Sequence, residues 1–416
     1  MQGGEPLWDR RYEWRAVLLL SIGFGLVGLD RFIILPLFPV LQADLGLDYQ
    51  DLGLVAAVLA LSWGVCAVLF GSASDRLGRR GVIIPAVAAF SLLAGVTGLA
   101  SGLTGLLLIR ALMGATEGAF TPVSIAATIE ASKPTRRGFN LGMQQQLYAV
   151  LGLGFGPIIA TQLMLRVPSW RWVFLIVCLP GFVLSIILWR VLRNTQGTMA
   201  VTPATSAVEP AGEVRWRDVF RHRNVILNML GMCCMLTSLT VVTSMVPNYL
   251  TDHLHLTLQT MGGVMSAIGF GGFAGQLLLP GLSDRAGRKT VVVLCYAGTL
   301  ISLLALLRVG AEPMVLFALL FCASAFNNSM ICLNVGPLTS EAVDSRQTAT
   351  ATGLVVGAGE IFGGGVAPAL AGWVAKHFGI GSTFLLALGA LACGLLVSLA
   401  LVETVPSARR VRGARA

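Results

Sequence analysis

The chain has 416 residues, of which 55% are hydrophobic and only 12% are charged. Soluble domains carry about 25% charged residues, so this composition excludes an ordinary soluble protein and predicts a chain that crosses a membrane many times. The net charge of +9 would suit a nucleic-acid-binding protein. The basic residues, however, are spread over the breaks between apolar segments, so we expect no nucleic-acid partner.

Apolar segments follow one another along the chain, each long enough for a spanning helix of about 20 residues. Gly and Pro occur throughout, as membrane helices tolerate. The fold class predicted is an all-α membrane protein with twelve transmembrane helices in two six-helix halves. The predicted spans are 16–38, 51–73, 81–101, 104–128, 139–164, 171–192, 224–249, 258–280, 290–309, 313–338, 349–374 and 381–402.

Basic residues concentrate in every second hydrophilic break. They include Arg10, Arg11 and Arg15 before the first span, Lys133, Arg136 and Arg137 after the fourth, and Arg409, Arg410, Arg412 and Arg415 in the tail. The positive-inside rule places these breaks and both termini in the cytoplasm of a cell-membrane protein. The first apolar segment is long, carries charge in its middle and lacks a small-residue cleavage site, so we expect no cleaved signal peptide.

Signatures of enzymes and cofactor sites are missing from the chain. The eight cysteines fall within predicted spans and lack metal-ligand spacing, and the four histidines lie at loops or helix ends. His253-x-His255 could bind a metal, but a loop is the favoured interpretation. We therefore expect no disulfide framework and no metal site. With no Walker loop, dinucleotide-binding unit or Ser-His-Asp arrangement, the sequence predicts a protein that is not an enzyme and uses no cofactor.

The two halves look like repeats. We expect a first half over 1–192, a linker over 193–223 ending in a short amphipathic helix at 216–220, a second half over 224–402 and a basic tail over 403–416. Asp75-Arg76-Leu-Gly-Arg79-Arg80, after the second span, recurs as Asp284-Arg285-Ala-Gly-Arg288-Lys289 after the eighth. Internal repeats underlie alternating-access transporters, whose sites lie at the midplane between the halves.

On these motifs the chain resembles a major facilitator superfamily transporter over essentially its whole length. The stretch from Gly71 to Arg80 is similar to that superfamily's most diagnostic motif, although Pro280 replaces the leading glycine in the second copy. Leu106-x-x-x-Arg110-x-x-x-Gly114 is similar to its basic helix-4 motif. Gly152-x-x-x-Gly156-Pro157 is similar to a motif often associated with antiporters.

Five charges interrupt the predicted spans: Asp30, Arg31, Arg110, Glu117 and Glu360. Insertion scales put each such charge at about 2.5–3.5 kcal/mol, and residues of this kind usually mark a transport path. Asp30 and Arg31 lie about 100° apart on a helix, so we expect one to face a central cavity and the other a neighbouring helix. Arg110 and Glu117, nearly two turns apart, share a face and suggest a proton relay. A purely structural role is the alternative for all four.

Asp30-Arg31 together with Arg110-x-x-x-Gly114-x-x-Glu117 resembles the anion:cation symporter branch of the superfamily, which includes sialin-like carriers and sugar-acid importers. The resemblance implies that Arg31 binds the substrate carboxylate. It also implies that Asp30 and Glu117 carry protons and that Arg110 modulates Asp30.

Further polar side chains could contact a substrate. Gln144 and Tyr148 share one face of the fifth helix, and Asn327 and Asn334 share one face of the tenth, where they could orient a polar ligand. Interhelical hydrogen bonds are the alternative. Trp63 could line the cavity or simply pack.

Glu360 lies in the glycine-rich stretch 357–365. It could be a third proton site, a contact for an amine or a structural acceptor. The resemblance to the symporter branch assigns no role to Glu360. This leaves the substrate more open than the mechanism.

The repeated motif predicts a conformational latch made of Asp75, Arg76, Arg79, Asp284 and Arg285. These charges would pair with neighbouring helix ends when one side of the transporter closes and would separate when it opens. A solvated loop that obeys the positive-inside rule is the alternative.

The sequence therefore predicts a secondary transporter that carries a small organic anion together with protons. Its partners would be the anion, protons and the lipid bilayer, and we expect a monomer. The alternative is a proton antiporter that exports drugs or metabolites, as the Gly152–Pro157 motif and Glu360 would favour. A non-transporting sensor is disfavoured because the chain offers no large soluble domain.

Overall fold

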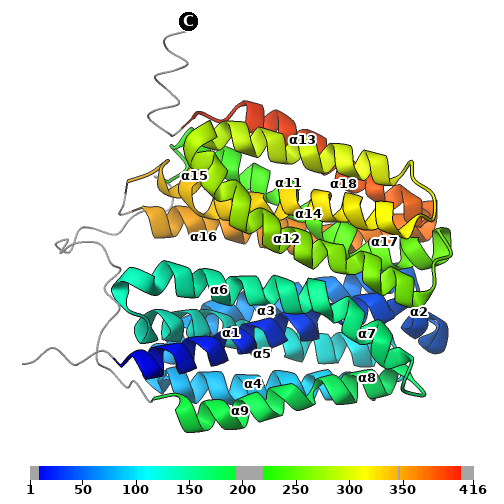
Figure 1. Cartoon of the computed structure of the whole chain (residues 1–416), viewed down its shortest axis with the longest axis horizontal. Helices are drawn as coiled ribbons and strands as arrows, with labels where there is room; N and C mark the ends of the chain where they lie inside the picture. Colours follow the sequence, from blue (N-terminus) through cyan, green and yellow to red (C-terminus); the bar gives the residue numbers. More distant parts are fainter. Residues whose placement is uncertain (1–8, 194–218, 345–346, 404–416) are drawn as a thin grey trace, which may run out of the picture. The chain divides into compact units, whose positions relative to one another are not determined.

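The computed structural model describes residues 9–193, 219–344 and 347–403, except for the side chains of 68, 71–77 and 349. Within this part every regular element is a helix, and twelve helices are long and apolar enough to cross a membrane. The predicted fold class is thereby confirmed (Figure 1). The linker helix predicted at 216–220 lies mostly outside the described residues, and the basic tail predicted at 403–416 lies outside them beyond Glu403.

The first six spans are built from these elements: α1 (Arg10–Phe32), α2 (Ile34–Leu45), α3 (Tyr49–Leu77), α4 (Arg79–Thr97), α5 (Leu103–Ala131), η1 (Pro134–Arg136), α6 (Arg137–Ala149), η2 (Val150–Phe155), α7 (Gly156–Met164), α8 (Trp170–Val177) and α9 (Leu179–Val191). The last six are built from α11 (Arg223–Asn248), η3 (Tyr249–His253), α12 (Leu258–Ala286), α13 (Arg288–Leu306), α14 (Pro313–Val335), α15 (Pro337–Ser340), α16 (Thr348–Gly359), η4 (Glu360–Val366), α17 (Ala367–Phe378), η5 (Ile380–Ser382) and α18 (Thr383–Leu399).

The helices form two compact units, and each unit combines two separate segments of the chain. The first unit takes the chain up to Ile34 and resumes at Leu61, while Leu35–Ala60 belongs to the second unit with the helices that follow the central stretch. The first predicted span therefore changes units near Ile34. The second changes units near Leu61, in the middle of α3.

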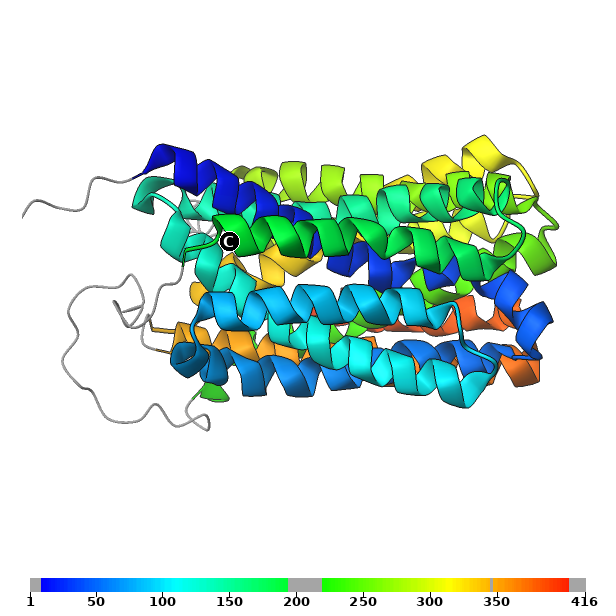
Figure 2. The same ribbon diagram turned by 90° about the horizontal axis from the view of Figure 1, so that it is seen from below.

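In the first unit, α1 packs on α6, η2 and α5, and α4 packs on α5, α8 and α9. Helices α4 and α9 run side by side along one edge of this unit (Figure 1, Figure 2). Aromatic side chains fill its centre: the Phe120 ring lies 6.5 Å from that of Phe24 and 5.8 Å from that of Phe90. Because all three rings are buried, this core ties α1, α4 and α5 together.

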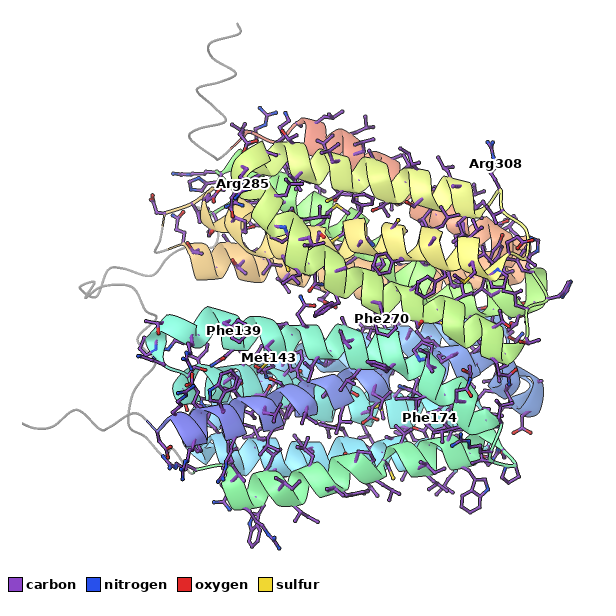
Figure 3. The ribbon with its side chains drawn as sticks, viewed as in Figure 1. Phe139, Met143, Phe174, Phe270, Arg285 and Arg308 are labelled. Atoms are coloured by element: carbon purple, nitrogen blue, oxygen red, sulfur yellow. The ribbon has the colours of Figure 1, made fainter. Side chains whose placement is uncertain are left out.

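In the second unit, α12 packs on α14, and α11 packs on α16 and α18. The buried Tyr296 of α13 donates a hydrogen bond of 2.7 Å to the backbone oxygen of Gly231 on α11. Arg285, at the end of α12, and Arg308, after α13, lie at opposite ends of this unit (Figure 3). The predicted sidedness requires this placement, since it assigns the two arginines to opposite faces of the membrane.

The repeated motif forms a one-residue break between two helices rather than a loop. Helix α3 continues to Leu77 and α12 to Ala286, beyond the predicted ends of these spans, and α4 and α13 begin two residues later. The residues between them, Gly78 and Gly287, have φ angles of 78° and 95°. Glycine adopts this region without the penalty that a Cβ would bring, which explains why the repeat keeps it.

The first span is interrupted directly after Phe32, the neighbour of Arg31. Helix α1 ends at Phe32, and α2 begins at Ile34. Pro36 lacks the N–H that would bond to the carbonyl of Phe32, so the proline breaks the helix at this point. Ile33 keeps helical backbone angles, φ −62° and ψ −25°, so the interruption is local.

Candidate functional site

Four of the five predicted intramembrane charges lie together in the first unit. Asp30 and Arg31 belong to the last turn of α1, while Arg110 and Glu117 belong to α5, which packs on α1. Asp30, Arg110 and Glu117 are 3%, 1% and 0% exposed, whereas Arg31 is only half-buried. The adjacent Asp30 and Arg31 thus have different surroundings, as the helical geometry predicts.

Arg110 reaches from α5 to the backbone of α1. Its Nη1 donates to the carbonyl oxygen of Asp30 at 3.3 Å and lies 3.5 Å from the sulfur of Met113. Its Nε and Nη2 are buried and have no hydrogen-bond partner among the described residues. The guanidinium therefore contacts Asp30 through its backbone. Its Nε and Nη2 can still donate hydrogen bonds.

Glu117 is the most enclosed carboxyl group of the site. Both of its oxygens are buried, and neither has a hydrogen-bond partner among the described residues. Its charge interacts with those of Arg31 and Arg110, and it also acts on Asp30. An ionised carboxylate in such surroundings costs free energy unless a positive charge lies nearby. Glu117 can therefore be accommodated either protonated or ionised with the arginines as counter-charges.

Close backbone contacts bring the helices of the site together. A Cβ added to Gly118, the residue after Glu117, would lie 2.4 Å from the carbonyl oxygen of Trp63 on α3. A Cβ added to Gly28 would lie 2.3 Å from the carbonyl oxygen of Tyr148 on α6. Small residues at such crossings are typical of membrane helices, and here they place Trp63 and Tyr148 beside the charged residues.

The antiporter-like motif coincides with a local change of helix type. Residues Val150–Phe155 form the π-helical turn η2, and Gly156 and Pro157 begin α7. Gly152 lies against the backbone of Gly28 on α1. Such π-helical turns frequently mark functional sites, and this one faces the end of α1 that carries Asp30.

Two aromatic rings lie close to the half-buried cation. The Cζ atom of Arg31 lies 5.8 Å from the ring centre of Phe32 and 5.9 Å from that of Trp63. The ring of Tyr148 lies 5.6 Å from that of Phe32 and 5.6 Å from that of Phe24. Distances of this size allow cation–π contact, so Trp63 lies at the candidate site.

The predicted amides are engaged in helix packing. Gln144 is fully buried, and its Nε2 donates to the hydroxyl of Ser124 on α5 at 3.1 Å. Asn327 is 3% exposed, and its Nδ2 lies 3.5 Å from the carbonyl oxygen of Met235; Asn334 is 2% exposed. The contacts of Gln144 and Asn327 correspond to the interhelical role that the sequence also allowed, whereas the Nδ2 of Asn334 is buried without a hydrogen-bond partner among the described residues. A role in substrate binding stays a prediction for all three.

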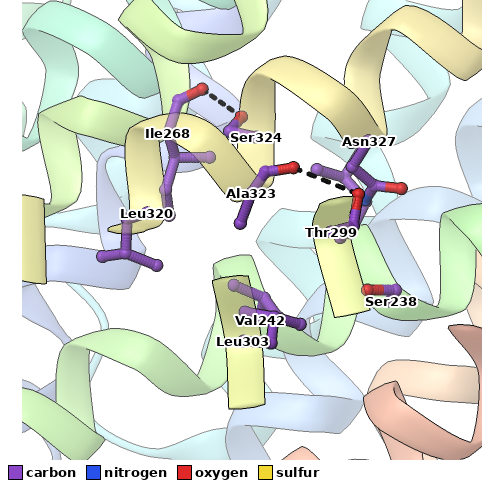
Figure 4. A pocket seen from close by; sticks show the side chains of 10 residues that line it. Ser238, Val242, Ile268, Thr299, Leu303, Leu320, Ala323, Ser324 and Asn327 are labelled. Carbon is purple, nitrogen blue, oxygen red and sulfur yellow. Dashed lines mark hydrogen bonds between the residues drawn. The ribbon is translucent and has the colours of Figure 1, made fainter. Parts of the chain in front are cut away.

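A small cavity borders Asn327 in the second unit. It measures about 20 Å³ and is lined by side chains of α11 to α14, including Ser238, Thr299 and Asn327 (Figure 4). The hydroxyl of Ser238 and the Oδ1 of Asn327 are buried without a hydrogen-bond partner in the described part of the chain. A cavity of this size fits one water molecule. Sites for organic molecules measure about 300–1,000 Å³, so this cavity is too small for a substrate.

Glu360 begins the π-helical turn η4 and is partly exposed. The same turn packs closely on α11, since the hydroxyl of Thr240 donates to the carbonyl oxygen of Gly363 at 2.6 Å. Glu360 thus occupies a distorted helix like that of η2. Its three predicted roles stay open.

Of the predicted latch residues, Arg79 and Asp284 form ion pairs, and so does Arg288, which stands in the second copy of the motif where Arg79 stands in the first. Arg79 pairs with Glu130 at 3.0 Å, and Arg288 pairs with Glu341 at 3.2 Å. Arg288 also binds Asp284 at 2.5 Å, whereas Arg285 is exposed. Asp75 and Arg76 belong to the last turn of α3, and their side chains lie outside the described part of the structure.

Sequence reasoning missed a buried carboxylate at the start of α1. Glu13 is 1% exposed, and its Oε1 accepts hydrogen bonds from the Nδ2 of Asn140 and the backbone N–H of Lys133, at 3.0 and 3.1 Å. It thereby ties α1 to the connection between α5 and α6. Glu13 is surrounded in sequence by arginines, and a lone acid among them was the available signal.

Sequence reasoning also missed a polar cluster in the second unit. Lys376 binds Asp48 at 2.7 Å, and the Tyr49 hydroxyl donates to Asp252 at 2.8 Å. Asn248 donates to Gln42 at 2.9 Å. These contacts join the segment 35–60 to α11, η3 and α17.

Comparison with known families identifies the class of this protein. Residues 20–356 and, in a second match, 228–416 correspond to the Major Facilitator Superfamily. The chain therefore belongs to the major facilitator superfamily and is a multi-pass membrane protein.

Curated relatives match nearly the whole chain. A hexuronate transporter of Bacillus subtilis (strain 168) is 25% identical over 405 residues, which is 94% of this chain and 94% of the relative. A sialic acid transporter of Escherichia coli (strain K12) is 23% identical and covers 88% of each chain. A 3-(3-hydroxy-phenyl)propionate transporter of the same organism is 29% identical, over 85% of this chain and 84% of the relative. The predicted resemblance to sugar-acid carriers is thereby confirmed.

Solved structures support the same fold. A bacterial homologue of the human lysosomal transporter Spinster, in an inward-facing and unoccupied conformation, has a TM-score of 0.74 at 16% identity and covers 94% of this chain and 98% of its own. A nucleoside transporter has a TM-score of 0.78 at 11% identity, with 94% and 99% covered. At these identities the likeness concerns the fold alone.

Proposed function

We propose that this protein is a secondary active transporter that carries a small organic anion together with protons. The observation that carries the proposal is the half-buried Arg31 beside the buried Asp30, Arg110 and Glu117. A cation that an anion can reach and acids that can exchange protons are the two components that such coupling requires.

Each charge has a distinct role in this proposal. Arg31 binds the carboxylate of the substrate, because guanidinium and carboxylate form paired, charge-assisted hydrogen bonds. Asp30 and Glu117 take up and release the coupled protons. Arg110, which bonds to the backbone of Asp30, positions Asp30 and supplies the positive charge that balances Glu117 when it is ionised.

The relatives support an anionic substrate. Hexuronate, sialic acid and 3-(3-hydroxy-phenyl)propionate, which name three of them, share a carboxylate although the rest of each molecule differs. A carboxylate is therefore the shared element that Arg31 would recognise. Gln144, Tyr148, Asn327, Asn334 and Glu360 remain proposed contacts for the remainder of the substrate.

In the same proposal the protein works as a monomer in the cell membrane, with both termini in the cytoplasm. The halves 1–192 and 224–402 alternate between inward-open and outward-open states, as in other transporters with internal repeats. The latch residues Asp75, Arg76, Arg79, Asp284 and Arg285 pair and separate during that cycle.

Proton movement in proteoliposomes tests this function. The purified protein is reconstituted, a panel of membrane-impermeant organic acids is added outside, and internal pH is recorded. We expect acidification of the lumen with at least one acid and its loss in Arg31→Ala. The exposed Arg166 provides a matched control, because Arg166→Ala removes a cation outside the site.

Other outcomes have defined meanings. Acidification that persists in Arg31→Ala would remove Arg31 from substrate binding. A failure of all acids, with protons leaving the lumen when lipophilic cations are supplied, would replace the symport proposal by proton-coupled export.

A further inference from the structure

Two aromatic side chains lie close to the half-buried Arg31. Phe32 and Trp63 lie beside Arg31, and Tyr148 packs on Phe32; the three rings are here called the aromatic wall, and all four side chains are half-buried. The Cζ of Arg31 lies within 5.9 Å of the ring centres of Phe32 and Trp63. The ring of Tyr148 meets that of Phe32 edge-on.

Backbone contacts hold the aromatic wall in place. Gly118 lets α5 approach the backbone of Trp63, and Gly28 lets α1 approach the backbone of Tyr148, since a Cβ at either glycine would come within 2.4 Å of a carbonyl oxygen. The rings are therefore carried by backbone segments that pack closely on neighbouring helices. A rigid aromatic surface favours a flat partner, because it loses little freedom on binding.

The amides predicted to contact a polar substrate are buried, whereas the rings of Phe32, Trp63 and Tyr148 are half-buried. Gln144 is 0% exposed, Asn327 3% and Asn334 2%. An aromatic body needs only apolar surface and ring contacts.

We infer that the anion carried by this protein has an aromatic body. Its carboxylate binds the guanidinium of Arg31, and its ring packs on Trp63 with Phe32 and Tyr148 at its edges. This inference rests on the proposed function, since it names the class of anion that the same site takes. Trp63 is then the residue that determines specificity.

Binding to the purified, full-length protein tests the inference. Calorimetric titration compares 3-phenylpropionate, D-glucuronate and propionate, which share a carboxylate but differ in the body attached to it. We expect 3-phenylpropionate to bind at least about tenfold more tightly than D-glucuronate. Trp63→Leu should weaken 3-phenylpropionate about tenfold and leave propionate unchanged, because a ring–ring contact contributes that much.

Two further variants keep this result interpretable. Trp63→Phe retains a ring and should keep the preference for 3-phenylpropionate even if Trp63→Leu does not fold. Trp172→Leu removes an exposed tryptophan of α8 and should bind like the parent protein. If Trp63→Leu lowered the affinities for 3-phenylpropionate and propionate equally, this result would contradict a role of Trp63 in specificity.

The outcomes separate the two proposals. Tighter binding of D-glucuronate would overturn the aromatic substrate and leave the proposed anion transport intact. Folded protein that binds none of the three acids, and that shows no proton movement with any acid in proteoliposomes, would refute the proposed function itself.

Discussion

Individual residues carry the proposed coupling. Asp30 and Arg31 are neighbours in sequence, yet one is buried and the other half-buried. The buried group can hold a proton out of contact with water, while the accessible group can meet an anion. Because Glu117 has no hydrogen-bond partner among the described residues, its state depends on protons and on the two arginines nearby.

Removing the charge of Glu117 should therefore separate anion movement from proton movement. In Glu117→Gln we expect the pH dependence of uptake to flatten, while anion exchange across the membrane continues, because the amide cannot release a proton. Anion-driven acidification and anion counterflow, measured in the same proteoliposomes, check this expectation. An unchanged pH dependence would assign the coupling to Asp30 or to another group.

At the scale of elements, close helix crossings determine where these residues lie. Helix α5 contacts the backbone of α3 at Gly118, whereas Gly105 on the same helix has open space around its Cα. The two glycines look alike in sequence. Only the neighbouring helix distinguishes them.

Gly118→Ala should lower both stability and transport. A Cβ placed 2.4 Å from the carbonyl oxygen of Trp63 must push α5 and α3 apart, and overpacking of this kind costs about 1–3 kcal/mol. Gly105→Ala is the matched control and should leave stability unchanged or raise it by up to ~1 kcal/mol through helix propensity. The melting temperature in detergent and the rate of anion uptake should be measured for both variants. Equal effects of the two substitutions would contradict a close helix crossing at Gly118.

The contact between Asp48 and Lys376 gives an element-scale prediction with a defined pH range. Burial raises the pKa of Asp48, but the hydrogen bond and charge of Lys376 and the backbone N–H of Asp51 lower it more, so that the pKa lies below its ordinary value of 3.8. A group with a lowered pKa stabilises the folded state above its unfolded pKa and loses this effect as pH falls through the folded value. The contribution of this contact to stability should therefore be complete at neutral pH, begin to fall near the unfolded pKa of about 3.9, and be lost once the pH drops through the lower folded pKa.

Lys376→Met should lower the melting temperature slightly at pH 7, because exposed ion pairs contribute about 0.2–1 kcal/mol. Lys376→Arg keeps the charge and should match the parent protein. The difference between Lys376→Met and the parent should shrink as the pH falls below about 4 and vanish once the pH passes the lowered pKa of Asp48. A difference that grows on acidification would show that Lys376 stabilises the protein through another contact.

At the scale of the whole molecule, the repeated motif provides equivalent ion pairs in the two halves. Arg79 and Arg288 each follow a glycine with positive φ, and each pairs with a glutamate of a later helix or helix end, Glu130 or Glu341. Pairs at equivalent places suit a latch that forms and breaks as the halves change state.

Arg79→Gln and Arg288→Gln should therefore change turnover more than substrate affinity. We expect each to slow transport by up to about fivefold, as the loss of about 1 kcal/mol of ion-pair energy allows, with an unchanged Kd. Uptake rates and calorimetric titration separate the two quantities. If both variants had the turnover of the parent protein, the latch role would be wrong, and the two arginines would serve only the positive-inside rule.

Much of this architecture can be read from the chain itself. The twelve spans, the internal repeat and the charges at Asp30, Arg31, Arg110 and Glu117 were predictable, because the cost of placing polar groups in lipid makes apolar length and rare charges reliable signals. The same reasoning could not decide the role of Gln144 or Asn327, since helical spacing gives a face but not the element that packs on it.

The sequence alone determined that this protein is a multi-span membrane transporter with an unusual set of buried charges, because bilayer thickness and desolvation act on each segment separately. Only the tertiary structure decided that Arg31 lies among aromatic rings, that Glu13 joins α1 to the α5–α6 connection, and that residues 35–60 group with the second unit. These features depend on contacts between segments far apart in the chain, and no local pattern of residues encodes such contacts.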